Sequence, residues 1–411
     1  MSSNLSRRRF IAGLGAGAGA GALGVAAAGP AGAIGLERNT EEEEELLPLE
    51  EAKVPFDGEH QAGISTPPQA DLWLIAFDVK DDVDRARLRG MMRLWTADAR
   101  RMSQGIPPKT DLEPEMYTAP ANLTFTVGFG AGFFDAIDRV DERPEWLGPL
   151  PEYQTDELRD EWNDGDLCLQ ICCDDPLMLS HAARWMIKNA APFLDIKWVQ
   201  TGFLNALGAR EPEATPRNRF GQLDGTVNPR GEEDFDKVVW IESGPDWLRG
   251  GSAMVVRRIE MDIDGWDILD RPSREEVAGR TLDTGAPLGG TDEFEPVDLE
   301  ATDEYGLPII DRNSHVARSM PPKEYPNQRI LRRVYNYDLP PEPDGRFTSN
   351  TGLIFICYQK NPLEQFHPIQ ERLAERDRLN EWIFHIGSAV FAMPRGTSDP
   401  EEYWAQDLLE D

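Results

Sequence analysis

The chain has 411 residues, with 74 acidic and 42 basic side chains and a formal net charge of −32. This balance excludes nucleic-acid binding through general electrostatic attraction, which requires a basic surface. The length is sufficient for two core-forming units in one chain.

The uniform acidity indicates a protein adapted to high salt, because a strongly charged surface keeps a protein soluble while self-repulsion destabilises its fold. We hypothesise a halophilic host. The free energy of unfolding is expected to increase between dilute buffer and molar KCl, since dissolved ions screen the repulsion between acidic side chains. Thermal melts in the two solutions check this, and equal stability in both would contradict it.

Residues 1–35 predict a twin-arginine export signal. Arg7 and Arg8 precede Phe10 and a Gly- and Ala-rich segment that reaches about Ala33. That segment is too weakly apolar for a stable membrane span. We expect the twin-arginine translocation machinery to export the protein to the cell envelope or the extracellular space. The acidic residues of 36–53 are expected to form a disordered linker.

A first folded unit is expected over 54–215. The spacing of apolar residues predicts helices at 83–102 and 176–189, and strands at 71–79, 123–129, 166–173 and 193–202. The resulting order, β-α-β-β-α-β, is the split pattern of a ferredoxin-like unit.

The four cysteines are expected to be small buried apolar residues. Cys168 and Cys172 share one face of a predicted strand, and Cys173 points to the other. The sequence has no Cys-x-x-Cys-His motif, which excludes covalent haem attachment of the c type.

The loop 220–230 presents one acid, Asp224, between Gly221 and Gly225. Two glycines allow the backbone to turn tightly and to lie close against a flat partner. The alternative is an ordinary turn in which the aspartate bonds to its own backbone.

A second α+β unit is expected over 216–411. Strands are predicted at 253–261, 352–359 and 382–393, a helix at 362–379, and short helical pieces at 266–269 and 274–280. A polar segment from 281 to 312 is too long for an ordinary connection, which indicates a functional loop.

His315 is the candidate metal ligand among five histidines, because it lies on a predicted loop that can present its ring to a haem iron. His181, His367 and His385 lie on predicted helices or strands and are expected to be surface or hydrogen-bonded core imidazoles. The histidine spacing fits no zinc motif.

Two adjacent arginines, Arg332 and Arg333, are flanked by apolar and aromatic residues. They fit either a solvated edge strand or a guanidinium held in a cavity to stabilise a developing anion. Leu353 and Phe355 alternate along the next predicted strand and therefore face the same way. The pair fits two structural roles, packing in the core or forming the wall of an apolar pocket.

Taken together, these motifs resemble the dye-decolourising peroxidases, in the exported subgroup with a twin-arginine signal. The Gly-x-x-Asp-Gly motif at 221–225, the segment 56–64, His315, Arg332 and the strand at 352–359 occur in the family's order. The resemblance extends from about residue 54 to residue 397.

The resemblance implies an α+β fold of two ferredoxin-like units, arranged like a dimeric α+β barrel, with one haem b per chain in the C-terminal unit. It implies a peroxidase that uses hydrogen peroxide to oxidise dyes and other organic one-electron donors. His315 matches the proximal iron ligand, while Asp224 and Arg332 match the distal pair that promotes O–O heterolysis. Arg333 is a close rival to Arg332. Gly225, Leu353 and Phe355 match residues around the cofactor.

Two positions depart from the family pattern. Gln222 stands where phenylalanine is common, and Val334 stands where some relatives have a polar distal residue, so a third distal hydrogen-bonding partner is expected to be missing. The long acidic segment is expected to alter access to the haem edge. The alternative function is haem binding with haem delivery or iron release, in which peroxidase activity is incidental. Homo-oligomerisation is left open.

Overall fold

The computed structural model describes residues 48–117, 119–211, 214–343 and 345–410. The predicted export signal and most of the predicted linker lie outside these ranges. The end of that linker is folded, since Ala52 is buried and its carbonyl accepts a hydrogen bond from the N–H of Asn122 at 2.9 Å. The linker was therefore predicted too long at its C-terminal end.

The first half of the chain forms a four-stranded antiparallel sheet in the order β4-β1-β3-β2. Its strands are β1 (Asp71–Val79), β2 (Thr124–Phe129), β3 (Leu167–Cys173) and β4 (Leu194–Phe203). Two helices, α1 (Arg85–Met102) and α3 (Pro176–Ala190), carry apolar stripes that pack against one face of this sheet. Asp84 and Asp175 cap them through their side chains, which accept backbone N–H groups of the first turn.

The second half repeats this arrangement with the strand order β9-β5-β8-β7. Its strands are β5 (Ser252–Met261), β6 (Leu331–Arg332), β7 (Tyr335–Leu339), β8 (Asn350–Gln359) and β9 (Ile383–Met393). The helices of this half are α5 (Ile263–Ile268), α6 (Arg271–Ala278), α7 (His315–Ser319) and α8 (Phe366–Arg376). Both halves thus have the expected ferredoxin-like order, although β7 was not among the predicted strands.

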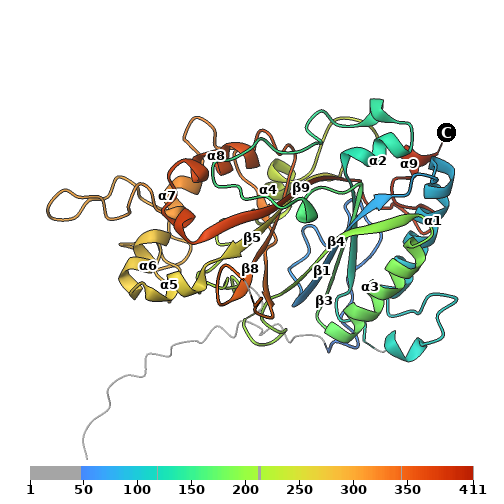
Figure 1. The fold of residues 1–411 in the computed structure, drawn as a ribbon, viewed down its shortest axis with the longest axis horizontal. Helices are drawn as coiled ribbons and strands as arrows, with labels where there is room; N and C mark the ends of the chain where they lie inside the picture. Colours follow the sequence, from blue (N-terminus) through green and yellow to red (C-terminus); the bar gives the residue numbers. More distant parts are fainter. Residues whose placement is uncertain (1–47, 118, 212–213, 344, 411) are drawn as a thin grey trace, which may run out of the picture. The chain divides into compact units, whose positions relative to one another are not determined.

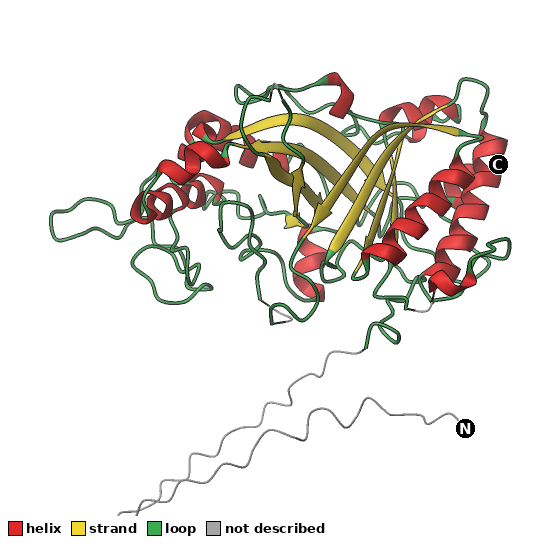
Figure 2. Cartoon of the chain, turned by 60° about the horizontal axis from the view of Figure 1, so that its bottom comes forward, coloured by secondary structure: helices red, strands yellow, loops and turns green. Residues whose placement is uncertain are grey.

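The two sheets join edge to edge at two places, where Phe129 pairs with Ala392 and Phe203 pairs with Asn336. Because β5 also pairs with β8, the described strands close into a barrel-like sheet. Its interior is filled by alternate side chains from both halves, including Leu74, Cys168, Val256, Ile354 and Phe391. Figures 1 and 2 show the strands in the middle, with α1 and α3 on one side and α5, α6, α7 and α8 on the other.

Shorter elements complete the described chain, namely α2 (Ala131–Ala136), α4 (Glu232–Val238), α9 (Gln406–Leu409) and the 3₁₀ turns η2 (Pro114–Tyr117), η3 (Val140–Glu142), η4 (Asp160–Trp162) and η5 (Arg378–Glu381). The four cysteines are free and buried, as expected. Cys168 and Cys172 face the barrel interior, while Cys173 faces the helices. None of the helices in the described ranges is both long and apolar enough to cross a lipid bilayer.

Candidate active site

A cavity of about 710 Å³ lies on the outer face of the C-terminal sheet, between β5, β8 and β9 and the helices α7 and α8. Its apolar wall includes Ile259, Met261, Leu353, Phe355 and Leu373. This volume falls in the range of small-molecule and cofactor sites. Two histidines, His315 and His385, line it together with Asp224 and Arg332.

His315 is held by a buried carboxylate. Its Nδ1 lies 2.6 Å from Oδ2 of Asp377, and the other carboxylate oxygen of Asp377 accepts the backbone N–H of Leu379 at 2.9 Å. Asp377 thus ends α8, caps η5 and orients the imidazole at the same time. With Nδ1 bonded to Asp377, Nε2 is the nitrogen left for a metal, an arrangement typical of metal-ligating histidines.

The sequence predicted that His315 lies on a loop. In the structure it is the first residue of the helix α7. Ser314 caps the helix, since its side chain accepts the N–H of Ala317. The preceding helix α6 ends at Gly279, whose φ of 78° is left-handed. A Cβ at this glycine would collide with Val316 and Ser314, so the glycine allows α6 to approach α7 closely.

The Asp377 carboxylate should make the stability of the ligand-free protein depend on pH. Burial alone lowers the pKa of the His315 imidazole, but Asp377 raises it, and the net pKa lies above the ordinary value for histidine. The resulting stabilisation is complete below the unfolded pKa of ~6.5 and is lost as the pH rises through the raised folded value. Asp377→Asn should therefore destabilise the ligand-free protein more at about pH 5.5 than at about pH 9, as measured by urea unfolding. An equal loss at both pH values would contradict this.

Asp224 is buried and lines the cavity, where the loop 220–230 presents it. Its Oδ1 accepts the Arg332 guanidinium at 2.5 Å, and its Oδ2 accepts Nδ2 of Asn218 at 3.1 Å. The carboxylate is therefore bonded to side chains and does not form the turn bond that was the alternative. Gly221 and Gly225 have φ values of 80° and 133°, which an L side chain rarely adopts.

Arg332 lies on β6, which pairs with β8. Asn228, in the loop 220–230, holds the backbone of Arg332 through two hydrogen bonds. The Asn228 side chain accepts the N–H of Arg332 at 3.0 Å and donates to its carbonyl at 2.7 Å. Nε of Arg332 is buried and has no partner in the described structure. This arginine therefore keeps a donor beyond the one that it uses on Asp224.

The structure distinguishes the two adjacent arginines. Arg333 points away from the cavity and donates to the Thr66 carbonyl at 2.5 Å and to the Gln69 side chain. Arg333 is 3% exposed and the Arg332 side chain is 21% exposed, so neither arginine is the solvated edge residue that was the alternative. Arg332 is the one at the cavity.

The remaining predicted residues divide into two groups. Leu353 and Phe355 line the cavity as expected, and so does Gln222, whose buried Nε2 has no partner in the described structure. Gly225 forms part of the backbone turn that presents Asp224, as its φ of 133° indicates, and its contact with the cofactor stays a prediction. Val334 is buried in the apolar cluster outside the cavity, and Asn218 supplies the additional polar contact to the distal acid.

The long acidic segment reaches the cavity, where residues 293–297 form part of its wall. Glu293 holds this segment in place, because its carboxylate accepts hydrogen bonds from two hydroxyls. These are the hydroxyl of Thr226, in the loop 220–230, at 2.8 Å and that of Thr215, just before the loop, at 2.5 Å. Phe294 lies 4.3 Å from the Arg230 guanidinium. The segment therefore forms part of the cavity wall and is held to the loop 220–230.

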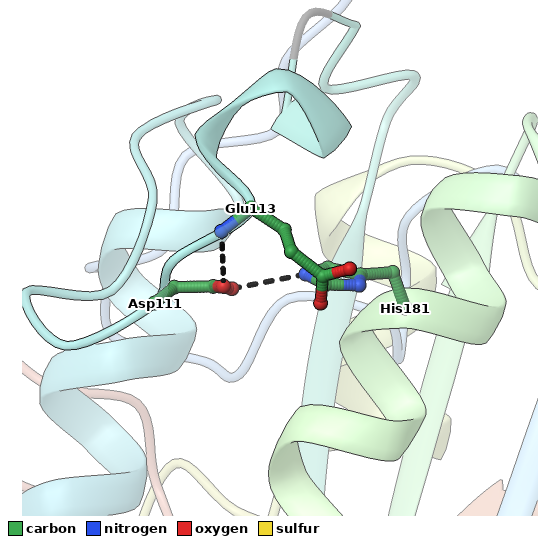
Figure 3. Close-up of side chains that lie close together, drawn as sticks. All are labelled: Asp111, Glu113 and His181. Atoms are coloured by element: carbon green, nitrogen blue, oxygen red, sulfur yellow. Dashed lines mark hydrogen bonds and ion pairs between the residues drawn. The ribbon is translucent and has the colours of Figure 1, made fainter.

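A second cluster of potential metal ligands lies away from the cavity, in the N-terminal half (Figure 3). His181 Nε2 lies 2.9 Å from Oδ2 of Asp111, which also accepts the Tyr117 hydroxyl at 2.6 Å. The other Asp111 oxygen accepts the N–H of Glu113 at 2.9 Å. These protein contacts already satisfy the Asp111 carboxylate, so we interpret the cluster as a hydrogen-bonded anchor for the loop before η2, and His181 as the expected core imidazole.

Two further histidines, His367 and His385, also have protein partners. His367 Nδ1 lies 2.9 Å from the Tyr153 hydroxyl, and His385 Nε2 lies 3.3 Å from Nε2 of Gln370. His385 is 4% exposed, and its Nδ1 has no partner in the described structure. Burial and the nearby Arg257 hold the pKa of His385 well below the usual range. Sequence spacing gave no indication that this histidine would line the same cavity as His315.

The donor set fits a haem. The cavity combines apolar walls, a carboxylate-oriented imidazole, and a paired carboxylate and guanidinium. An iron macrocycle requires such a ligand, while the proton transfers of peroxide cleavage require such a distal pair. The fold and the cavity thus define a haem-dependent oxidoreductase.

Comparison with known proteins narrows this class to a family. The N-terminal model of the Dyp-type peroxidases matches residues 61–204 and the C-terminal model matches residues 215–398. A dye-decolorizing peroxidase of Thermobifida fusca is 39% identical, with 98% of this chain and 97% of that protein covered. A deferrochelatase of Escherichia coli strain K12 is 34% identical, with 87% of each protein covered. The crystal structure of a DyP-type peroxidase from Cellulomonas bogoriensis is 45% identical, with a TM-score of 0.84, 89% of this chain and 100% of that chain covered.

The chain belongs to the Dyp-type peroxidase family. It is a haem peroxidase, and its cofactor is haem. The expected enzyme class, fold and cofactor are therefore confirmed.

Proposed function

We propose that this protein uses hydrogen peroxide to oxidise dyes and other organic one-electron donors, with one haem b bound in the cavity. The observation that supports this most directly is that the Asp224–Arg332 pair and the His315–Asp377 pair line one cavity. His315 would be the iron ligand. Asp224 and Arg332 would act on the peroxide.

The bound haem supplies the iron at which peroxide is cleaved and the oxidising equivalents that result. Asp224 accepts a proton from the inner oxygen of the peroxide and delivers it to the outer oxygen, as a general base and then a general acid. The Arg332 guanidinium stabilises the negative charge that develops on the departing oxygen. Asn218 holds the second oxygen of Asp224 in place. Leu353 and Phe355 limit the water around these groups.

The purified protein with haem should be red-brown, with an intense Soret band. One equivalent of hydrogen peroxide, mixed rapidly with it, should change that spectrum within the dead time of ordinary manual mixing. An added phenolic or dye donor should restore the original spectrum while the donor is oxidised. A colourless protein after haem addition, or a haem spectrum that peroxide leaves unchanged, would contradict the proposal.

A second function, haem binding with delivery of haem or release of its iron, is favoured by the deferrochelatase relatives at 34–35% identity. In that function the haem should exchange readily with apomyoglobin, and its reaction with peroxide should be slow. Rapid peroxide oxidation with slow haem exchange supports the peroxidase. The two rates, measured on the same preparation, separate the two functions.

We also propose export through the twin-arginine pathway, which the paired residues Arg7 and Arg8 and the weakly apolar segment after them support. An Arg7→Lys, Arg8→Lys variant should accumulate inside the cell with haem bound. Export of that variant at the original rate would contradict the pathway.

A further inference from the structure

We propose that Tyr153 is a redox residue of this peroxidase, which passes electrons from donors too large for the cavity while His367 accepts its phenolic proton. The inference rests on the proposed peroxidase function and extends it to bulky donors. Of the eight tyrosines of the chain, Tyr153 would be the one at which donors are oxidised outside the haem cavity.

The hydrogen bond between the two side chains has the geometry of a proton transfer. The Tyr153 hydroxyl and Nδ1 of His367 are 2.9 Å apart, and the phenol donates when the imidazole proton is on Nε2. Tyr153 is 7% exposed, and burial raises its pKa far above the usual range. The phenol therefore stays protonated, and it can lose an electron readily only if its proton leaves at the same time. A neutral imidazole is suited to accept that proton.

Tyr153 lies between the cavity and the protein surface. Its ring is 5.5 Å from the guanidinium of Arg257, which lines the cavity. On its other side the neighbouring residues Pro151 and Glu152 are exposed, and His367 on α8 is half-buried. One side chain thus separates the phenol from the cavity, and a thin layer separates it from solvent.

Other tyrosines in the described ranges lack this combination. The hydroxyls of Tyr335 and Tyr358 are bonded to the Cys172 thiol and the Gln170 amide, neither of which is a useful base. Tyr117 and Tyr403 are bonded to the carboxylates of Asp111 and Glu410, and both lie in the packing of the N-terminal unit and not along the cavity wall. Tyr153 has a proton acceptor and also contacts a cavity residue.

The electrons and protons balance in two steps. First, Tyr153 gives one electron to the cofactor that peroxide has oxidised and its proton to His367, which leaves a neutral tyrosyl radical and an imidazolium. Second, a donor at the surface gives one electron to the radical, and His367 returns the proton to the phenolate oxygen. The donor leaves as a one-electron oxidised product and releases any proton of its own to solvent.

The test is electron paramagnetic resonance of the haem-loaded protein, frozen shortly after one equivalent of peroxide is added without a donor. The wild-type protein should show a tyrosyl signal that narrows when the tyrosines carry ring deuterium. Tyr153→Phe, which keeps the ring against Arg257, should lose this signal. His367→Gln keeps a hydrogen-bond acceptor but no useful base, so the signal should form about 100-fold more slowly. Tyr325→Phe, at an exposed tyrosine, is the matched control and should leave the signal unchanged.

Donor kinetics give a second measurement. The ratio of kcat/KM for a bulky dye to that for a small phenol should fall in Tyr153→Phe and stay unchanged in Tyr325→Phe. A tyrosyl signal and a ratio that both survive in Tyr153→Phe would overturn the role of Tyr153 while the peroxidase function stands. A wild-type protein whose haem spectrum does not respond to peroxide would overturn both.

Discussion

Arg332→Leu should reduce kcat/KM for hydrogen peroxide by about 10²- to 10³-fold, the usual effect of removing one donor that stabilises a developing oxyanion. The guanidinium contacts Asp224 at 2.5 Å, and its Nε is buried without a partner in the described structure. It is therefore positioned to act on a group in the cavity as well as on the carboxylate. Haem should remain bound with a normal Soret band, because His315 and Asp377 do not depend on this arginine.

A matched control is available in the same cavity. Arg329 also lines it and also pairs with a carboxylate, Asp234, through two contacts of 2.6 Å and 2.8 Å. Arg329→Leu removes the same charge without disturbing Asp224, so its effect on the reaction with peroxide should be small. Equal losses in the two variants would show that cavity charge, and not the position of Arg332, controls the rate.

A combined variant tests whether Asp224 and Arg332 act together. Asp224→Asn alone should cost about 10²- to 10⁴-fold, the range for a lost general acid–base group. If the two side chains serve one step, the double variant should be hardly slower than the slower single variant, since losses within a catalytic unit are not additive. Multiplicative losses, measured by stopped-flow mixing with peroxide, would indicate separate roles.

Much of the fold follows from local sequence patterns. Runs of apolar residues located β1, β3, β5 and β9 within a few residues of their observed bounds, because most residues on both faces of these strands are buried. The strand β7 (Tyr335–Leu339) was missed, since it has five residues and its last two are exposed. Its position depends on pairing with β8, which sequence periodicity does not report.

Candidate site residues could be predicted from the sequence where the residue type itself indicates the chemistry. The partners that position these residues could not be predicted, because they are distant in sequence. The Asp377 contact to His315 spans 62 residues, and the Asn228 clamp on Arg332 spans 104. Asp377 directly precedes η5, where aspartate commonly serves as an N-cap, so its sequence context gave no second role. The start of α7 had a usable signal, because Ser314 is a typical capping residue directly before His315.

The conformational role of the motif glycine was predictable from the sequence. Gly225 has a φ of 133°, which the tight turn that presents Asp224 requires. Its match to a residue around the cofactor rests on the family resemblance alone.

His315→Ala should abolish stable haem binding if this imidazole binds the iron, as we propose, because it is the side chain of α7 in the cavity that can ligate a metal. Titration of the ligand-free protein with haemin, followed by absorbance, should show no saturable Soret band at micromolar protein. Added imidazole should restore part of that band, since the substitution leaves room for a free imidazole beside Asp377. A variant that binds haem with the wild-type spectrum and affinity would show that His315 is not the ligand.

His385 is the rival that this experiment has to exclude, because it also lines the cavity and its depressed pKa keeps it neutral. Its Nε2 contacts Gln370 at 3.3 Å, and within the described ranges no carboxylate bonds to it as Asp377 bonds to His315. His385→Gln should therefore retain the Soret band, whereas Asp377→Asn should weaken haem affinity by about 10- to 100-fold through loss of the group that orients the ligand. Loss of haem in His385→Gln with retention in His315→Ala would reverse the assignment and place the iron against the sheet instead of against α7.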